Sequence, residues 1–76
     1  MTTKHVYSHP RILRISEVQK RIGFSKSYIY ALQAKGIFPK SIKLAKGGRA
    51  AGFIETEIDD YVNERILSSR HPNHEQ

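Results

Sequence analysis

Two short helix-forming segments joined by a tight turn constrain the fold of this chain more than any other feature. The first opens on Ser16, with Gln19 completing a capping box, and Gly23 supplies a left-handed end. The second follows Ser25 as its N-cap and ends at Gly36. A helix of about two turns is not stable without tertiary packing. The pattern therefore predicts a helix-turn-helix whose two helices share one core.

The second segment, residues 26–35, has two faces of different character. Helical spacing places Ile29 and Leu32 on the buried side. The opposite face holds small and polar side chains with lysines at its margins: Ser27, Tyr30, Ala31 and Ala34, then Lys26 and Lys35. Such a face fits a DNA major groove about 12 Å wide. The alternative is an ordinary amphipathic helix with a tyrosine at its surface.

Extended segments flank the two helices. Residues 12–15 form a short β-prone run, and Pro39 forces the chain out of the second helix. Residues 42–44 alternate as a half-exposed strand, residues 46–49 form a turn, and residues 50–54 return as the partner strand. A hairpin with a basic tip predicts a wing beside the helix-turn-helix. The alternative is a solvated turn that keeps a sheet edge soluble.

The last patterned segment predicts a third helix that closes the core, with Thr56 as its N-cap. Its apolar stripe comprises Ile58, Tyr61, Val62 and Ile66. Its solvent-facing acids are Glu57, Asp59, Asp60 and Glu64. We expect this helix to be too short for a coiled coil.

The predicted fold class is α+β, a small winged helix-turn-helix with three helices and a β-hairpin wing. Residues 11–67 form this domain, between flexible tails at residues 1–10 and 68–76. Seventy-six residues allow one small domain, and we find no internal repeat.

Charge is distributed unevenly along the chain. Residues 1–54 hold eleven of the thirteen lysines and arginines and a single acid, whereas residues 55–76 hold six acids and two arginines. Like charges at such density repel one another and indicate a polyanionic partner. The alternative is ordinary solubilising charge.

Several classes of protein are excluded by composition. The chain has no cysteine, which removes disulfides and thiolate metal ligands and fits a reducing cytoplasm. No apolar run approaches the roughly 18 residues of a membrane span, and the N-terminus has no signal-peptide core. We therefore expect a cytoplasmic protein.

Catalytic and metal chemistry find no support in the sequence. No nucleophile elbow or phosphate-binding loop is present, so we expect no enzyme, catalytic residue or cofactor. The four histidines lie in the tails, without acidic or cysteine ligands held nearby: His5, His9, His71 and His74. We expect solvated histidines and no zinc site.

Candidate DNA contacts come from the second helix and the hairpin. Ser27 can hydrogen-bond base edges, Tyr30 can reach a base or phosphate, and Arg49 suits the negative minor groove. The predicted major-groove residues are Ser25, Lys26, Ser27, Tyr28, Tyr30, Ala31 and Lys35. The predicted backbone and minor-groove residues of the wing are Lys40, Lys43, Lys46, Gly47, Gly48 and Arg49.

The order of these motifs resembles the AlpA family of prophage regulators. The resemblance rests on residues 12–18, 23–30 and 36–44, and on the start of the third helix at 56–59, and it covers about residues 11–66. This chain departs from the family pattern at Tyr28, where Thr is usual, and at Ala31, where a basic residue is frequent. Phe53 and Tyr61 stand where tryptophan is common.

The resemblance implies a MerR-like winged helix used by mobile elements. Such proteins act as excisionases (recombination directionality factors), which bind and bend attachment-site DNA for a tyrosine integrase, or as transcription regulators of the integrase gene. By position, Ser25, Lys26, Ser27 and Tyr30 meet the major groove and residues 46–49 the minor groove.

The implied partners are double-stranded DNA, a tyrosine integrase, and further copies of the protein side by side on DNA. We place the excisionase first because the sequence offers no obvious dimerisation helix. A regulator of the integrase gene is the second hypothesis. A basic module that binds an acidic protein or RNA is the third.

Overall fold

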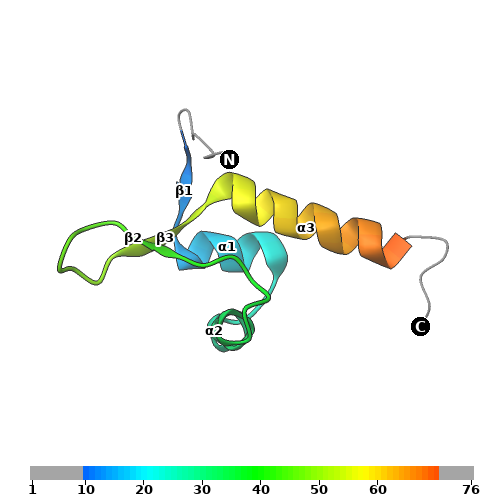
Figure 1. Ribbon diagram of the computed structural model, residues 1–76, viewed down its shortest axis with the longest axis horizontal. Helices are drawn as coiled ribbons and strands as arrows, with labels where there is room; N and C mark the ends of the chain where they lie inside the picture. Colours follow the sequence, from blue (N-terminus) through cyan, green and yellow to red (C-terminus); the bar gives the residue numbers. More distant parts are fainter. Residues whose placement is uncertain (1–9, 71–76) are drawn as a thin grey trace, which may run out of the picture.

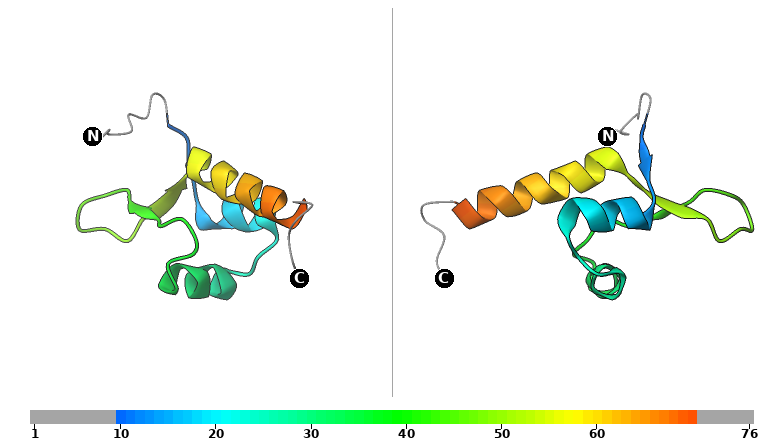
Figure 2. Two further views of the ribbon diagram at one scale, coloured as in Figure 1. Left: turned by 45° about the vertical axis from the view of Figure 1, so that its right-hand side comes forward. Right: turned by 180° about the vertical axis from the view of Figure 1, so that it is seen from behind.

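The computed structural model describes residues 10–70, which form three helices and a small antiparallel sheet. The elements in chain order are β1 (Ile12–Leu13), α1 (Ile15–Ile22), α2 (Lys26–Ala34), β2 (Ile42–Lys43), β3 (Ala51–Ile54) and α3 (Glu55–Arg70) (Figure 1). In every view α1 lies between α2 and α3 (Figures 1 and 2). The predicted α+β fold, a winged helix-turn-helix, is confirmed.

The central strand of the sheet is β3, with β1 on one side and β2 on the other. Leu13 pairs with Phe53 on the β1 side, and Ile42 pairs with Gly52 on the β2 side. Gly52 is buried, and a Cβ atom there would collide with the Ile12 side chain and lie 3.2 Å from the Leu13 carbonyl oxygen. This close approach of β1 requires a glycine at the centre of the sheet.

One hydrophobic core draws on β1, β3, all three helices and the segment that follows α2. Its buried side chains are Leu13, Val18, Ile29, Leu32, Phe38, Phe53 and Ile58. Phe38 lies at its aromatic centre, because its ring centroid is 4.7 Å from that of Tyr61 and 6.1 Å from that of Phe53. The short helices are therefore held by tertiary packing, as their length requires.

The ends of the helix-turn-helix follow three of the expected local signals. Gly23 adopts the left-handed conformation after α1 and donates its N–H to the Gln19 carbonyl at 2.7 Å. The Ser25 hydroxyl oxygen accepts a hydrogen bond from the Tyr28 N–H at 3.1 Å and caps α2. Gly36 has a φ of +74° just past the end of α2. These three predictions are confirmed.

The predicted N-cap at Ser16 is wrong, because Ser16 lies inside α1. The cap is Arg14, whose carbonyl accepts from the N–H groups of Glu17 and Val18 at 2.9 and 3.1 Å. Strand β1 ends at Leu13, and α1 has its N-cap at Arg14, two residues before the predicted N-cap at Ser16. The predicted strand at residues 12–15 is correspondingly shorter.

The predicted N-cap at Thr56 is also wrong, because α3 begins at Glu55, directly after β3. The Glu55 N–H donates to the Arg11 carbonyl oxygen at 2.8 Å, so the first residue of α3 is hydrogen-bonded to the residue before β1. The helix continues to Arg70, three residues past the residue 67 at which the folded domain is predicted to end.

The apolar stripe of α3 is buried only in its first half. Ile58 is buried, and Tyr61 and Val62 are half-buried, but Ile66 is 43% exposed and Leu67 is 70% exposed. The C-terminal turns of α3 project past α1 and α2 (Figures 1 and 2). The expectation that Ile66 is buried is therefore wrong.

The hairpin turn falls close to its predicted place. The Gly48 N–H donates to the Ala45 carbonyl at 3.1 Å, and Gly47 has a φ of +76° within this turn. Leu44 and Ala50 extend the pairing of β2 and β3 through a 2.9 Å hydrogen bond. The loop projects away from the C-terminal end of α3 (Figure 2).

Candidate nucleic-acid interface

The face of α2 opposite the core is exposed. Ile29 and Leu32 are buried, while Tyr30 is 52% exposed. The other predicted members of this face are also exposed: Lys26, Ser27, Ala31, Ala34 and Lys35. Apart from Tyr30 and the two lysines, these side chains are short, so the backbone of α2 can closely approach another surface.

Tyr28 occupies a different position from the rest of the predicted set. Its ring packs edge-on against Phe24, with the ring centroids 4.8 Å apart. Together with Leu32 and Tyr61, it lines a groove between α2 and α3. Tyr28 therefore lies on the α3 flank of α2, and its contact with DNA remains a prediction.

The wing presents basic side chains on a narrow loop. Lys43, Lys46 and Arg49 are exposed around the turn, and Gly48 is half-buried. Lys40 is exposed on the connection that leads from α2 to β2. The basic residues predicted for DNA contact are thus accessible.

A hydrogen bond that local sequence signals do not reveal fixes this connection. The Gln33 side-chain Nε2 donates to the Pro39 carbonyl oxygen at 3.1 Å. This hydrogen bond ties Pro39 to the last full turn of α2. Lys40 and the start of β2 therefore leave α2 in a defined direction.

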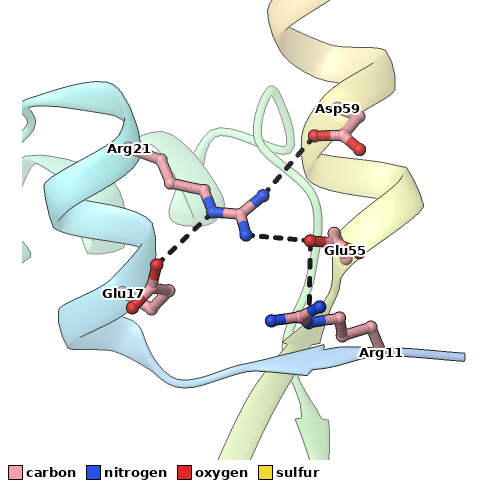
Figure 3. Close-up of polar contacts among 5 residues, drawn as sticks. All are labelled: Arg11, Glu17, Arg21, Glu55 and Asp59. Atoms are coloured by element: carbon pink, nitrogen blue, oxygen red, sulfur yellow. Dashed lines mark ion pairs between the residues drawn. The ribbon is translucent and has the colours of Figure 1, made fainter.

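Three acidic side chains and two arginines form an ion-pair network that joins α1, the start of α3 and the residue before β1 (Figure 3). The Arg21 Nη2 atom lies 2.8 Å from Glu55, and other Arg21 nitrogens lie 3.6 Å from Glu17 and 3.8 Å from Asp59. Arg11 lies 3.9 Å from Glu55. Within residues 10–70, none of these ion pairs includes a lysine of α2 or the wing.

Glu17 is the single acid among residues 1–54, and its carboxylate lies 3.6 Å from Arg21 in this network, outside the wing. The hydrogen bond with Glu55 raises the pKa of the Arg21 guanidinium above its ordinary value, while desolvation opposes the rise. Because the pKa is raised in the folded state, this contribution to stability is present below the ordinary pKa of arginine while the carboxylates are ionised, and it is lost as the pH rises through the raised pKa. Arg21 therefore stays charged at neutral pH, where it pairs with Glu17, Glu55 and Asp59.

Two further features of residues 10–70 bear on other kinds of site. Residues 10–70 contain no group of three histidine, aspartate or glutamate side chains that could bind a metal. The four histidines lie outside the described residues, so their predicted solvation stays a prediction. In this same part of the chain, no helix has both the length and the apolar character of a membrane span.

The model of the prophage CP4-57 regulatory protein family, AlpA, matches residues 11–66. This chain belongs to the AlpA family. The matched region of this AlpA protein includes the helix-turn-helix, the wing and most of α3, and the predicted resemblance is confirmed. The last turn of α3 lies beyond the matched region.

A relative of this AlpA protein occurs in a bacterial virus. The uncharacterized protein ORF88 of Enterobacteria phage P4 is 38% identical over 60 residues. The match covers 79% of this chain and 66% of ORF88, slightly under two thirds of that protein's length. No solved structure matches the chain.

Proposed function

We propose that this AlpA protein binds double-stranded DNA, with α2 in the major groove and the wing on the adjacent backbone and minor groove. The observation that carries the proposal is the exposed α2 face of short and polar side chains beside a lysine- and arginine-bearing loop. The acids of the network pair with arginines outside α2 and the wing. Membership of a prophage regulatory family supports the same reading.

Each element has a distinct role in this proposal. Ser27 and Tyr30 contact base edges, and the Ala31 methyl group packs against a thymine methyl group. Ser25, Lys26 and Lys35 contact phosphates or bases at the margins of the groove, and Lys40 and Lys43 follow the backbone. Lys46 and Arg49 reach the minor groove, where glycines at 47 and 48 permit close approach.

The biological role that we propose is excision of a mobile element. The protein binds and bends attachment-site DNA, so that a tyrosine integrase assembles in the excisive direction, and it carries out no catalysis itself. Its relative in a bacterial virus supports this role. Transcriptional control of the integrase gene is the second candidate, favoured by the family's description as regulatory.

Salt dependence of binding tests the DNA proposal. About five phosphate contacts give a log–log slope of binding constant against salt near −4 to −5. Equilibrium titrations of labelled duplex across a salt series measure this slope, with structured RNA as the competitor. A shallow slope contradicts the proposal and favours a protein or RNA partner. Competition in which structured RNA displaces the labelled duplex as well as unlabelled duplex does has the same meaning.

Matched substitutions separate the two contact classes. Tyr30→Ala should change the preferred sequence, whereas Arg49→Ala should weaken all duplexes evenly and reduce the salt slope by about one. Selection from randomised duplexes followed by titration of the selected sites measures both effects. The groove assignment is wrong if both variants affect selected and random DNA equally.

Recovery of host DNA distinguishes the two biological roles. Purified protein is mixed with sheared DNA of its own host, and the retained fragments are sequenced. Enrichment beside an integrase attachment site supports excision, whereas enrichment confined to promoters supports transcriptional control. An excision assay with the neighbouring integrase then measures whether the protein changes the direction of recombination.

A further inference from the structure

The projecting end of α3 carries an apolar surface that the protein's own core does not cover. A groove of about 310 Å³ runs between this end of α3 and the end of α1. It is lined by Ile22, Phe24, Tyr61, Val62, Arg65 and Ile66, among others. Ile66 is 43% exposed although it belongs to the same helix face as the half-buried Val62. The groove lies away from the wing, because the C-terminal end of α3 and the wing project toward opposite ends of the molecule (Figure 2).

Spacing along α3 defines one continuous face around this groove. Asp59, Val62, Ile66 and Arg70 follow one another at three- and four-residue intervals, which keeps them on one side of a helix. Leu67, although 70% exposed, is about 100° away from Ile66 and does not line the groove. The face is thus apolar in the middle, acidic at one end and basic at the other.

We infer that this face binds the α3 face of a second copy, in an antiparallel pair with twofold symmetry. An antiparallel pair brings Ile66 of one copy level with Val62 of the other, and Arg70 level with Asp59. Both matches occur twice, as an isologous interface requires. Charge complementarity selects this occupant: Arg70 is exposed, and the Asp59 carboxylate is 57% exposed although it lies 3.8 Å from Arg21.

The pairing is weak in free solution. The face comprises about three helical turns and part of α1, which is small beside the roughly 1,200–2,000 Å² buried in stable interfaces. Self-association therefore occurs at high protein concentration, where sedimentation equilibrium from micromolar to millimolar protein detects it. The inference concerns protein–protein contact alone and does not rest on DNA binding.

Neighbouring residues of α3 provide a matched test. Ile66→Glu places a charge in the middle of the face and should weaken self-association at least about tenfold. Leu67→Glu introduces the same charge one residue away, off the face, and should leave the association within about twofold. Circular dichroism and thermal unfolding of both variants check that the domain stays folded.

Charge reversal tests the antiparallel register. Arg70→Glu should weaken the association, and the double variant Arg70→Glu with Asp59→Lys should regain most of it. Failure of the double variant to recover overturns the register. A wild-type protein that stays monomeric to millimolar concentration, or equal losses for the two glutamate variants, overturns the inference as a whole.

Titration of a single DNA site with the same variants keeps the two proposals apart. Ile66→Glu should bind an isolated site as the wild type does, because α2 and the wing are unchanged. If the wild type does not bind a single DNA site, the proposed function is contradicted, and the self-association result is unaffected.

Discussion

At the scale of single residues, backbone crowding at Gly52 decides whether the sheet can form. Gly52 lies between β1 and β2, and Leu44 reaches within 3.4 Å of the place where a Cβ would lie, in addition to the contacts with β1. A side chain there has no room to move aside, because backbone atoms form part of its surroundings. The sequence alone shows only a glycine in a strand, which has several possible explanations.

Gly52→Ala should destabilise the domain by about 1–3 kcal/mol, because the added methyl group forces β1 away from β3. Gly48→Ala is the matched control: its added Cβ meets Ala45 at 3.3 Å in an exposed loop that can shift. We expect the control to change the free energy of unfolding by less than about 0.5 kcal/mol. Urea unfolding measures both, and equal effects contradict the crowding argument.

At the scale of elements, the helix ends show which boundaries are set by neighbouring residues and which by tertiary contacts. The caps of α2 depend on atoms within four residues, so Ser25 and the following Tyr28 N–H define its start. The starts of α1 and α3 are set by the strands before them, because only Arg14 separates β1 from α1 and α3 begins at the residue directly after β3. Ser16 and Thr56 have suitable side chains but lie one or two residues too late.

Substitution of the two serines distinguishes these cases. Ser25→Ala should reduce stability by about 1 kcal/mol, because the Tyr28 N–H loses its acceptor. Ser16→Ala should stay within about 0.5 kcal/mol of the wild type, because alanine is a good helix former inside α1. Chemical unfolding curves check the pair. A loss at Ser16 as large as that at Ser25 shows that Ser16 is a cap in solution.

At the scale of the whole molecule, the ion-pair network joins elements that are distant in sequence. Arg21 on α1 contacts Glu55 and Asp59 on α3, and Arg11 beside β1 shares Glu55 (Figure 3). Because the network is partly exposed, its contribution to stability is modest and is screened by salt.

Arg21→Gln should lower the temperature of unfolding, and the difference from the wild type should shrink as salt is added. Removing the guanidinium leaves Glu17, Glu55 and Asp59 without this shared cation, so their mutual repulsion adds to the loss. Lys20→Gln removes a positive charge from the same helix and serves as the control. A salt-independent difference, or an equal effect at Lys20, argues against an electrostatic role for the network.

Sequence by itself determined the features that depend on a few neighbouring residues. Glycine and serine signals located the turn between α1 and α2, and the spacing of Ile29 and Leu32 oriented α2, because helix periodicity alone decides which residues share a face. Gly47 located the hairpin turn, and motif order identified the family. The candidate surface on α2 and the wing was accessible to prediction for the same reason.

Tertiary structure decided whatever depends on contacts between distant segments. It placed Tyr28 against Phe24 on the flank of α2, and it held Pro39 through Gln33. It also left Ile66 exposed, because the core ends after about two turns of α3 while the helix continues. An apolar residue at a helical interval indicates a face that can be buried, but only the positions of the other elements determine how far along the helix a partner extends.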